Sequence, residues 1–492
     1  EEIPFYHKQQ RVVLENCGSS DAEDIEEYIA KGGYAGFEKA LFEMTDEEIC
    51  RSIIDSGLRG RGGGGFPAGQ KWDGARKQKS EKKYIVCNGD EGDPGAFMDR
   101  SIMEGNPHSV LEGMMIAGRA VGSDEGYIYV RAEYPLAVSR LKAAIAKAEE
   151  YGLLGDHVMG TDFSFRIHVN MGAGAFVCGE GSALTASIEG NRGMPRVKPP
   201  RTIEHGLWAE PTVLNNVETF ANVPLIIRKG VDWYRSIGTK TSPGTKAFAL
   251  TGNVVNTGLI EVPMGTTIRE VVFDIGGGIR GGKKFKAVQI GGPSGGATTA
   301  SREHLDLPLD FDSLKSIGAM IGSGGLVVMD EDTCMVETAR FFMEFTQKES
   351  CGKCVPCREG TRRMLEILTR IVNNEGSLED LDLLEDLSST ITETALCGLG
   401  QSACKPVQST LKYFRDEYLA HVVEKHCPHC NGRKKELHID PELCKGCGKC
   451  MRQCPMEAIS GQIRMPHVID TEKCIKCGAC WGCCPFGAIR EE

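Results

Sequence analysis

The C-terminal stretch Cys444-Lys-Gly-Cys-Gly-Lys-Cys-Met-Arg-Gln-Cys-Pro455 holds four cysteines in a C-x2-C-x2-C-x3-C-P run. The stretch from Cys474 to Pro485 repeats this spacing. In such a run the x2 steps direct three sulfurs to one iron–sulfur cube, and the x3-C-P step sends the fourth sulfur to a second cube. The spacing therefore predicts two 4Fe–4S clusters, one bound by Cys444, Cys447, Cys450 and Cys484, and the other by Cys474, Cys477, Cys480 and Cys454.

Paired C-x2-C units also suit zinc, so a double zinc site is the alternative. Zinc needs only four ligands and has no use for a fourth cysteine shared between two sites, nor for the proline that follows it. We therefore expect residues 438–492 to form a bacterial-type ferredoxin domain that moves single electrons.

Composition and charge limit the classes of protein to which this chain can belong. The chain has 492 residues with 57 basic and 68 acidic side chains, a formal charge of −11 that argues against nucleic acid or anionic lipid as a main partner. We find no apolar run long enough to span a bilayer and no signal peptide, so we expect a cytoplasmic protein. The 21 cysteines point to metal ligation in a reducing compartment. Because the chain begins at Glu1 and not at Met, we expect that a segment precedes it.

Patterning predicts a multidomain α/β protein. Short β-branched runs alternate with helical stretches up to about residue 240, which is typical of a largely parallel sheet. Glycine-rich turns then separate short strands, and a helical period follows. We expect lead-in helices over 1–50, an α/β domain over 51–240, a small α+β domain over 245–330, a helical bundle over 333–426, a hinge over 427–437 and the ferredoxin domain over 438–492.

Two helix starts are readable in the lead-in segment. Ser19 or Ser20 could cap a helix that runs from Asp21 to Ala30, and Thr45 could cap a second helix.

A first glycine cluster resembles a phosphate cradle. It reads Gly57-Leu-Arg-Gly-Arg-Gly-Gly-Gly-Gly-Phe-Pro-Ala-Gly-Gln-Lys-Trp72. Backbone N–H groups can point at oxygens where no Cβ intrudes; two arginines, Arg59 and Arg61, accompany the glycines, and Lys71 can supply positive charge. The cluster is neither a GxGxxG fingerprint nor a Walker A motif, which excludes Rossmann and P-loop assignments. A flexible linker is the alternative.

Two more motifs follow predicted strands. The first is Asn88-Gly-Asp-Glu-Gly-Asp-Pro-Gly-Ala-Phe97. It offers carboxylates and an amide at the carboxyl edge of the predicted sheet, where α/β proteins bind nucleotides. By itself such an acidic turn is ordinarily a solvated loop. The second motif is a strand-to-helix turn suited to a phosphate or a flat ring. It reads Gly172-Ala-Gly-Ala-Phe-Val-Cys-Gly-Glu-Gly-Ser-Ala-Leu184. The amides of Asn215 and Asn216, with Thr219, could complete such a site.

The predicted helical bundle contains Cys351-Gly-Lys-Cys-Val-Pro-Cys357. Its three thiolates, Cys351, Cys354 and Cys357, suit three corners of a cube, and Cys397 is the natural fourth ligand. A structural zinc is the alternative here.

A last group of cysteines surrounds the hinge. Cys427 and Cys430 form a C-x2-C pair, and Cys404 and His421 could complete a structural zinc site. His426 or His429 could replace His421, and the alternative is two unligated cysteines in a linker. The other cysteines are expected to pack as small apolar side chains: Cys17, Cys50, Cys87, Cys178, Cys334 and Cys483.

The order of these motifs resembles the flavin-bearing, NADH-binding subunit of respiratory complex I (the 51 kDa-type subunit) and its relatives in soluble hydrogenases and formate dehydrogenases. The resemblance covers residues from about 30 to 420. It implies FMN in the glycine-lined pocket, NAD(P)(H) stacked over its ring, and a 4Fe–4S cluster that takes electrons away. It also implies a ubiquitin-like (β-grasp) domain over 245–330.

The resemblance also implies site residues. Glu91 and Glu180 are the candidate catalytic carboxylates, and Phe176 is a further cofactor contact. FMN would be bound by Gly60, Gly62, Lys71, Asn88, Asp90, Glu91, Gly179, Glu180, Asn215, Asn216 and Thr219. The nicotinamide nucleotide would face Phe66, Lys71, Glu91, Asp93 and Lys198.

Two departures from the respiratory pattern matter. Respiratory members lack the C-terminal ferredoxin module, and they usually read Cys-Gly-Glu-Glu-Thr where this chain has Cys178-Gly-Glu-Gly-Ser182. Losing the second carboxylate should alter how tightly reduced flavin and NAD are held. Both departures resemble the beta subunit of electron-bifurcating hydrogenases and related NAD(P)-dependent formate dehydrogenases.

We therefore expect an FMN-dependent NAD(P)H dehydrogenase (diaphorase) subunit with three 4Fe–4S clusters and a structural zinc. The flavin exchanges a hydride with NAD(P)H and single electrons with clusters. The implied partners are ferredoxin, a thioredoxin-like 2Fe–2S small subunit, and a hydrogenase or formate dehydrogenase catalytic subunit, coupled by flavin-based bifurcation. The alternatives are a plain NADH dehydrogenase feeding one acceptor and an electron-wiring scaffold that binds no nucleotide.

Overall fold

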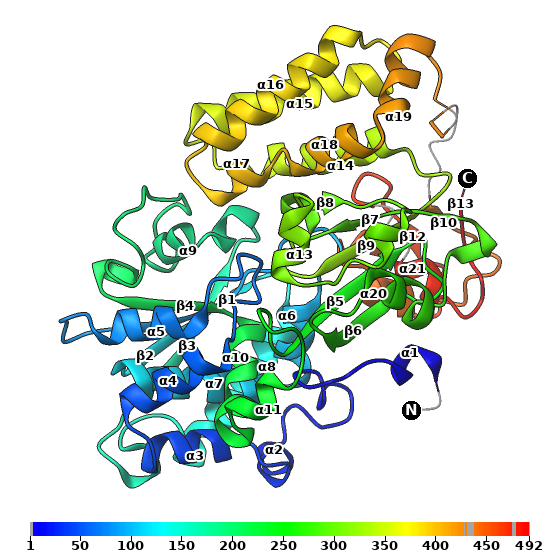
Figure 1. Ribbon diagram of the computed structural model, residues 1–492. Coiled ribbons are helices and arrows are strands. Elements are labelled where there is room, and N and C mark those ends of the chain that lie inside the picture. The colour runs from blue at the N-terminus through cyan, green and yellow to red at the C-terminus, as the bar shows by residue number, and fades with distance from the viewer. Residues whose placement is uncertain (1–2, 428, 431–436, 475–478, 492) are drawn as a thin grey trace.

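The computed structural model describes residues 3–427, 429–430, 437–474 and 479–491. Its largest part, which we call the flavin-type domain, is built on a four-stranded sheet in the order β3-β2-β1-β4, and every neighbouring pair is parallel (Figure 1). Strand β1 is buried on both faces, as helices on both sides of a parallel sheet require. The strands are β1 Tyr84–Gly89, β2 Glu125–Arg131, β3 Arg166–Gly172 and β4 Thr212–Asn216.

Helices cover both faces of this sheet. Helix α7 is buried along almost its whole length against α10, and Gly113 permits this contact because a Cβ there would lie 2.1 Å from the Phe220 carbonyl oxygen. The predicted lead-in helices are not a separate unit, because α2, α3 and α4 contribute to the same core as the sheet. The helices are α2 Ile25–Ala30, α3 Ala35–Phe42, α4 Asp46–Ser56, α5 Ala68–Arg76, α6 Met98–Gly105, α7 Pro107–Val121, α8 Pro135–Glu150, α9 Gly181–Ile188, α10 Val217–Lys229 and α11 Val231–Arg235.

A second sheet has the order β6-β5-β9-β7-β8. Strands β5 and β9 are parallel to each other, and the other neighbouring pairs are antiparallel. The sheet has its own core, separate from that of the first sheet. Its elements are β5 Thr245–Gly252, β6 Gly258–Pro263, η4 Glu270–Ile275, β7 Phe285–Ile290, β8 Gly296–Ala297, α12 Arg302–Leu305, α13 Phe311–Ser316 and β9 Gly325–Asp330.

A helical bundle follows and lies at the top of Figure 1. Helices α14, α15, α16 and α18 pack around one core, while a separate apolar cluster joins the bundle to the flavin-type domain through Cys357 and Leu399. The elements are α14 Met335–Glu349, α15 Val355–Val372, α16 Leu378–Thr394, α17 Gly398–Ser402, α18 Lys405–Tyr413, α19 Arg415–Leu419 and η7 Ala420–Glu424.

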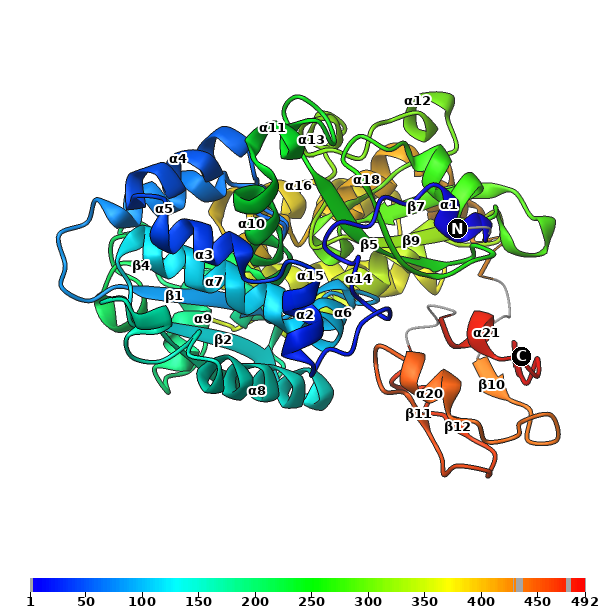
Figure 2. The ribbon, with the colours of Figure 1, turned by 90° about the horizontal axis from the view of Figure 1, so that it is seen from below.

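The C-terminal module is small and lies beside the second sheet (Figure 2). Two short antiparallel ladders, β10 with β13 and β11 with β12, alternate with two short helices, in keeping with the repeated cysteine run. Buried and half-buried cysteines pack into its core with a few aliphatic side chains. The elements are β10 Leu437–Ile439, α20 Lys449–Gln453, β11 Ile459–Ser460, β12 Val468–Ile469, α21 Ala479–Cys483 and β13 Ile489–Glu491.

Candidate functional site

The predicted flavin motifs meet at one edge of the parallel sheet. Asn88 lies at the end of β1, Asn216 ends β4, and the Gly172–Leu184 turn leaves β3 at the same edge. The short η2 helix (Phe176–Gly179) lies in that turn. Ligands of open α/β sheets bind outside the carboxyl ends of the strands, so this edge is where the topology predicts a nucleotide site.

The Gly60–Phe66 loop precedes α5 and is closed by its own backbone. The Gly60 N–H donates to the Phe66 carbonyl at 2.9 Å, and Gly63 and Gly65 have positive φ angles of 117° and 60°. Nothing lies within 4 Å of the Cβ position of Gly64, so the loop leaves open space over its backbone. This geometry fits a loop that receives oxygens on its N–H groups.

The two arginines of this loop do a different job from the one expected. Arg61 is buried and donates to the Tyr234 hydroxyl (2.9 Å) and the Pro243 carbonyl (2.8 Å). Arg59 donates to the Gly65 carbonyl (2.8 Å) and pairs with Asp312. Both guanidinium groups therefore hold the shape of the loop, which leaves Lys71 as the cation that this motif can offer to a ligand.

Lys71 carries that charge in a half-buried position. Its ammonium donates to the Leu214 carbonyl (3.1 Å) and lies 5.9 Å from the centre of the Phe66 ring. Burial, with a contribution from Lys198, lowers the pKa of Lys71 to about 8. Phe66 itself is 45% exposed at the rim of the loop, so its ring is available to a planar ligand.

Asp90 is the clearest sign of a missing partner. Both of its carboxylate oxygens are buried, and neither has a hydrogen-bond partner among the described residues. Burial raises the pKa of Asp90 to about 7, although Arg131 pulls it in the other direction. Its neighbour Asn88 fixes the turn, donating to the Gly179 carbonyl (2.9 Å) and accepting from the Asp90 N–H (3.0 Å). An unpaired buried carboxylate is costly, so this position calls for donors from a ligand.

Glu91, expected to be catalytic, caps a helix in this structure. It is 3% exposed, and its two oxygens accept from the N–H groups of Asp99 (3.1 Å) and Arg100 (3.0 Å) at the start of α6. Each oxygen accepts one N–H, so the carboxylate caps the first turn of α6. The catalytic role expected of Glu91 stays a prediction.

Asp93 connects the flavin-type domain to the second sheet. It accepts a hydrogen bond from the Ser323 hydroxyl, which lies just before β9, and burial raises its pKa to about 6. The Cβ position of Gly92 lies against Phe176, whose own N–H donates to Glu349 of α14 (2.9 Å). Three parts of the chain therefore converge on one loop.

Glu180 is the N-cap of α9. One oxygen accepts from the N–H groups of Ser182 and Ala183, both at 3.0 Å, and the other pairs with the Lys198 ammonium at 2.5 Å. Burial pushes the pKa of Glu180 up, but the Lys198 and Ser182 hydrogen bonds outweigh it and the pKa is lowered. Glu180 is therefore an ionised carboxylate at the mouth of the site, beside an ammonium that is half exposed.

The amides after β4 support the site from behind. The Asn216 side chain donates to Asp99 (2.5 Å) and accepts from the Glu218 N–H (2.9 Å), while its Cβ lies against the Cβ position of Gly62. The buried Asn215 amide donates to the Leu214 carbonyl (2.9 Å) and accepts from the Trp72 indole (3.2 Å). The Thr219 hydroxyl accepts from the Arg61 N–H (2.8 Å). Thr219 therefore holds the backbone of the glycine loop and Asn215 holds Trp72 of α5, while their expected contacts with FMN stay a prediction.

The bundle cysteines form what we call the inner cysteine site. Cys351, Cys354, Cys357 and Cys397 line one small cavity together with Val177 and Pro195 of the flavin-type domain. Lys353 locks this junction by donating to the Pro195 carbonyl at 2.6 Å. The fourth ligand predicted from sequence is thus brought to the triad, and Val177 places the site next to the turn that holds Phe176 and Glu180.

The C-terminal cysteines form the outer cysteine site. Cys444, Cys447, Cys450 and Cys484 line one small cavity, which is the crossed arrangement that the spacing predicts. Cys447 is exposed, whereas Cys450 is buried. Of the second predicted set, Cys454, Cys474 and Cys480 belong to the same small core, and Cys477 lies outside the described residues.

The predicted zinc group has one different member. Cys334, His421, Cys427 and Cys430 have ligand atoms that all lie within 4.8 Å of one another. Cys404 instead contacts the Met364 sulfur at 3.5 Å, inside the bundle core. Cys334 packs in the bundle core, as expected, and its position just before α14 also brings its sulfur to a C-x2-C pair that is far away in sequence. His421 Nδ1 faces the Asn374 amide oxygen at 3.0 Å, which leaves Nε2 for a metal.

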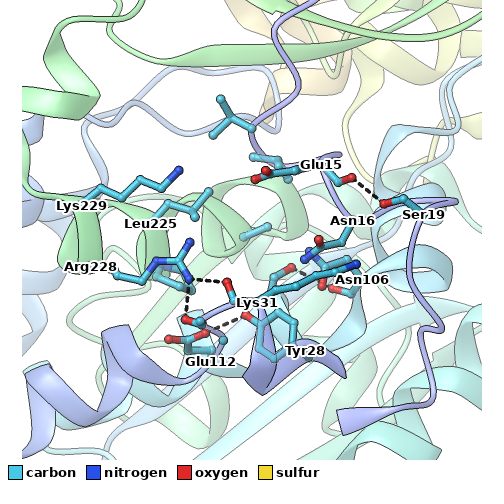
Figure 3. Close-up of a pocket in the computed structure, with 17 residues that line it drawn as sticks. Glu15, Asn16, Ser19, Tyr28, Lys31, Asn106, Glu112, Leu225, Arg228 and Lys229 are labelled. Carbon is cyan, nitrogen blue, oxygen red and sulfur yellow. Dashed lines mark hydrogen bonds between the residues drawn. The ribbon is translucent and has the colours of Figure 1, made fainter. Parts of the chain in front are cut away.

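A cavity of about 510 Å³ lies elsewhere, between the N-terminal segment and helices α7 and α10 (Figure 3). None of the predicted site residues lines it. Its buried Glu112 is satisfied by the Tyr28 hydroxyl (2.7 Å) and the Tyr34 N–H (2.9 Å), and Arg228 donates to the Lys31 carbonyl (3.1 Å). These groups hold the N-terminal segment in place.

Three family models match separate parts of the chain. Residues 53–225 match the Nuo51 FMN-binding domain, residues 337–421 the iron–sulfur binding region of NADH-ubiquinone oxidoreductase-F, and residues 437–460 and 467–490 the 4Fe–4S binding domain. These ranges contain the glycine loop and all the cysteines of the inner and outer cysteine sites. Among the described helices, none is both long and apolar enough to cross a bilayer.

Similar proteins cover nearly the whole chain. The HndC subunit of the NADP-reducing hydrogenase of Solidesulfovibrio fructosivorans is 55% identical over 461 residues, 94% of this chain and 93% of that protein. The F 2 subunit of the NADH-quinone oxidoreductase of Rhizobium meliloti (strain 1021) is 46% identical over 417 residues, 85% of this chain and 99% of that protein. A crystal structure of an NAD+-reducing [NiFe]-hydrogenase in the H2-reduced state matches with a TM-score of 0.75 and 34% identity, over 84% of this chain and 67% of that one. The chain therefore belongs to the family of FMN-binding, NADH-dehydrogenase-type subunits that occur in complex I and in NAD(P)-linked hydrogenases.

Proposed function

We propose that this chain is the FMN-containing subunit of a multi-subunit complex that exchanges hydride with NAD(P)(H) and single electrons with iron–sulfur clusters. The observation that carries the proposal is the unpaired, buried carboxylate of Asp90 at the carboxyl edge of a parallel sheet that also bears an open glycine loop. FMN has a hydroxyl-bearing chain that can donate to Asp90 and a phosphate that suits backbone N–H groups. The donor set therefore fits the group that the family implies.

FMN, when bound, supplies the conversion between a two-electron hydride and two single electrons. The protein's residues supply position and charge. Lys71 is half-buried, and burial and Lys198 lower its pKa to about 8; it offers a cation to the isoalloxazine or the nicotinamide nucleotide. Phe66 and Lys198 lie at the exposed mouth, where a dinucleotide enters, and Glu180 holds Lys198 in place.

The inner cysteine site provides the electron outlet. Val177 and Pro195 line its cavity, so side chains of the flavin-type domain form the wall between its loops and the cysteines. The ring of Phe176 also packs edge-on against Phe345 of α14, with ring centres 5.3 Å apart. This arrangement supports transfer from flavin to a 4Fe–4S cluster at Cys351, Cys354, Cys357 and Cys397.

The second sheet and the hinge have supporting roles in this proposal. The strand order β6-β5-β9-β7-β8, with β5 and β9 parallel, supports a β-grasp domain, which clamps the flavin loop through Ser323 and Asp93. We assign a structural zinc to Cys334, His421, Cys427 and Cys430, since three thiolates and one imidazole are a usual tetrahedral set. The zinc would fasten the end of the bundle to the segment that leads into the C-terminal module.

The ferredoxin-type module supports a second outlet, and with it flavin-based bifurcation between NAD(P)H and ferredoxin in a complex with a thioredoxin-like 2Fe–2S subunit and a hydrogenase or formate dehydrogenase. The 55% identity to a subunit named as part of an NADP-reducing hydrogenase favours the hydrogenase-type partner. The ferredoxin-type module argues against the first alternative, because a diaphorase that feeds one acceptor needs no second electron outlet. The Asp90 pocket argues against the second alternative, because a scaffold that binds no nucleotide needs no such pocket.

Anaerobic purification of the native complex tests the proposal. We expect about one FMN per chain, three 4Fe–4S clusters from this chain, and bleaching of the flavin absorbance by NADH or NADPH. Asp90→Asn should lose flavin while keeping its iron, and Glu112→Gln is the control for a buried carboxylate away from the pocket. A complex without flavin, or with flavin that neither nucleotide reduces, would overturn the assignment. Full-rate ferredoxin reduction by NADH alone would favour the diaphorase.

A further inference from the structure

The outer end of the C-terminal module carries a concentration of unpaired positive charge. Lys445, Lys449, Arg452 and Arg464 are all exposed, and none forms an ion pair with a carboxylate among the described residues. The chain as a whole has a net charge of −11, so a local excess of cations is not its general surface composition. The loop from Cys444 to Cys454 contains three of the four cations and no carboxylate.

These cations gather around the outer cysteine site. Lys445 lines the same cavity as Cys447, together with Phe486 and the buried His467. The Arg464 N–H donates to the Gly446 carbonyl at 2.9 Å, and the Arg452 guanidinium lies 3.1 Å from the Cβ position of Gly448. Gly446 and Gly448 flank Cys447 in the chain, so the positive groups surround the exposed cysteine of the site.

Apolar side chains lie among the cations. Ile463 is 76% exposed, Met465 is 58% exposed and Phe486 is 44% exposed. Ile463 and Met465 flank Arg464 on the β11–β12 loop, and the Met465 backbone packs against Gly446. Exposed apolar side chains rimmed by charges of one sign mark a protein docking surface. We call this surface the basic face; it consists of Lys445, Lys449, Arg452, Arg464, Ile463, Met465 and Phe486.

The opposite end of the module is already occupied by the rest of the chain. The Arg280 guanidinium lies over the Trp481 ring at 5.2 Å, and the Cβ position of Gly482 lies 3.2 Å from the Thr257 hydroxyl of the second sheet. Figure 2 shows α21 toward the body of the protein and the β11–β12 hairpin pointing away from it. The basic face is therefore presented outward, away from the attachment.

We propose that the basic face is the docking site of a small acidic electron-carrier protein, which exchanges one electron with the outer cluster. This inference rests on the proposed function, because it requires a 4Fe–4S cluster at the outer cysteine site. The transfer is a single electron from the reduced cluster to the oxidised carrier; no bond is made or broken and no proton moves. Charge complementarity selects the carrier, since like charges across an interface are repelled and opposite charges speed encounter.

The geometry also favours a transient complex over a permanent one. The apolar centre consists of three side chains in a ring of four cations, whereas permanent subunit interfaces are large and depleted in charge at the core. Weak redox encounters have small interfaces and depend on electrostatic steering. A diffusing carrier that must leave after each turnover suits such a surface.

The test uses the intact complex, with a purified acidic ferredoxin as the probe and benzyl viologen as an acceptor that needs no docking. Lys449→Glu precedes the cluster ligand Cys450, and the matched control Lys473→Glu precedes Cys474 at the other end of the module. We expect Lys449→Glu to raise the KM for ferredoxin severalfold, and Lys449→Glu with Arg464→Glu to raise it about tenfold or more at low salt. The control should stay within about twofold, and raising the salt concentration should shrink the difference.

Each result has a defined meaning. Carbodiimide cross-linking of the wild-type complex to ferredoxin should join carboxylates of the carrier to Lys445 or Lys449. If the viologen rate with NADH is absent in the wild type, the proposed function fails. If the viologen rate is present but the variants and the control have equal KM for ferredoxin, the docking site is overturned. Loss of a neighbouring subunit from the double variant on gel filtration would also overturn it, since the face would then be a permanent subunit interface.

Discussion

The inner and outer cysteine sites have the same ligand chemistry and opposite surroundings. The inner site is walled by Val177 and Pro195 of the flavin-type domain, and a lysine of its own motif, Lys353, fastens the two domains together. The outer site has an exposed ligand, Cys447, and cations in its loop. These surroundings fit the proposed division of roles, in which the inner site receives electrons from the flavin and the outer site passes them to a carrier. The difference lies in what the loops between cysteines touch, and not in the cysteines.

The largest expected effect comes from breaking the inner site. Cys397→Ser removes the fourth ligand, and we expect the loss of about four irons per chain and near-background electron transfer from NADH to any acceptor beyond the flavin. Flavin bleaching by NADH should persist, because the Asp90 pocket is untouched. Iron analysis, EPR and stopped-flow absorbance measure these outcomes, and Cys404→Ser in the same bundle is the control. Persistent transfer to ferredoxin would show that electrons bypass the inner site.

A second expected effect separates the pocket from the clusters. Asp90→Asn should weaken FMN binding by roughly tenfold to hundredfold, because a hydrogen bond to a charged acceptor contributes about 1.5–3 kcal/mol. The raised pKa of Asp90, about 7, also sets a pH dependence. Between about pH 4 and 7 the folded apo-protein holds a proton that the unfolded chain has released, so this carboxyl lowers stability as pH rises through that window.

This pH dependence of stability can be measured by comparing the wild type with Asp90→Asn. Apo wild type should lose thermal stability from pH 5 to pH 7.5 by more than apo Asp90→Asn does, and the variant should be the more stable of the two at pH 7.5. Differential scanning calorimetry on flavin-free protein gives the comparison. Parallel pH profiles for the two proteins would show that Asp90 is already paired.

A third expected effect concerns the link between the two cysteine sites. Cys334→Ser should remove about one zinc per chain, because tetrahedral sites need all four ligands. Cys404→Ser, also buried and also in the bundle, should keep its zinc. Elemental analysis of the zinc content of the two variants decides between Cys334 and Cys404 as the ligand. Zinc loss from Cys404→Ser alone would restore the ligand set expected from sequence.

The smallest expected effect comes from a substitution at Gly181, where this chain departs from the respiratory pattern. Gly181→Glu restores the second carboxylate, and a Cβ there meets only the Leu214 and Thr202 methyl groups at ordinary contact distance, 3.5 Å at the nearest. We expect stability within about 0.5 kcal/mol of wild type. The KM for NADH should change severalfold, because a new carboxylate joins Glu180 beside Lys198. Unchanged kinetics would mean that the second carboxylate does not reach the nucleotide.

Local patterns predicted the elements and the ligand triads well. Thr45 caps α4 with Glu48 in a capping box, as its sequence indicates, and the strands over Tyr84–Gly89 and Glu125–Arg131 lie where β-branched runs predict them. The predicted start of α2 was wrong: Asp24, and not Ser19 or Ser20, accepts from the first N–H groups, because residues 21–24 turn before the helix begins. Capping depends on a few neighbours, so one competing Asp moved the boundary.

What the sequence by itself determined is the chemistry that neighbours in the chain create: the C-x2-C-x2-C triads, the open glycine loop and the parallel sheet. These follow from spacing, because residues within one turn or one loop can meet only a few ways. The tertiary structure decided the rest. It assigned Arg61 and Glu91 to bracing, brought Cys334 to His421, and left Asp90 without a partner among the described residues. Those outcomes depend on contacts between segments far apart in the chain, and packing, which spacing does not encode, selects them.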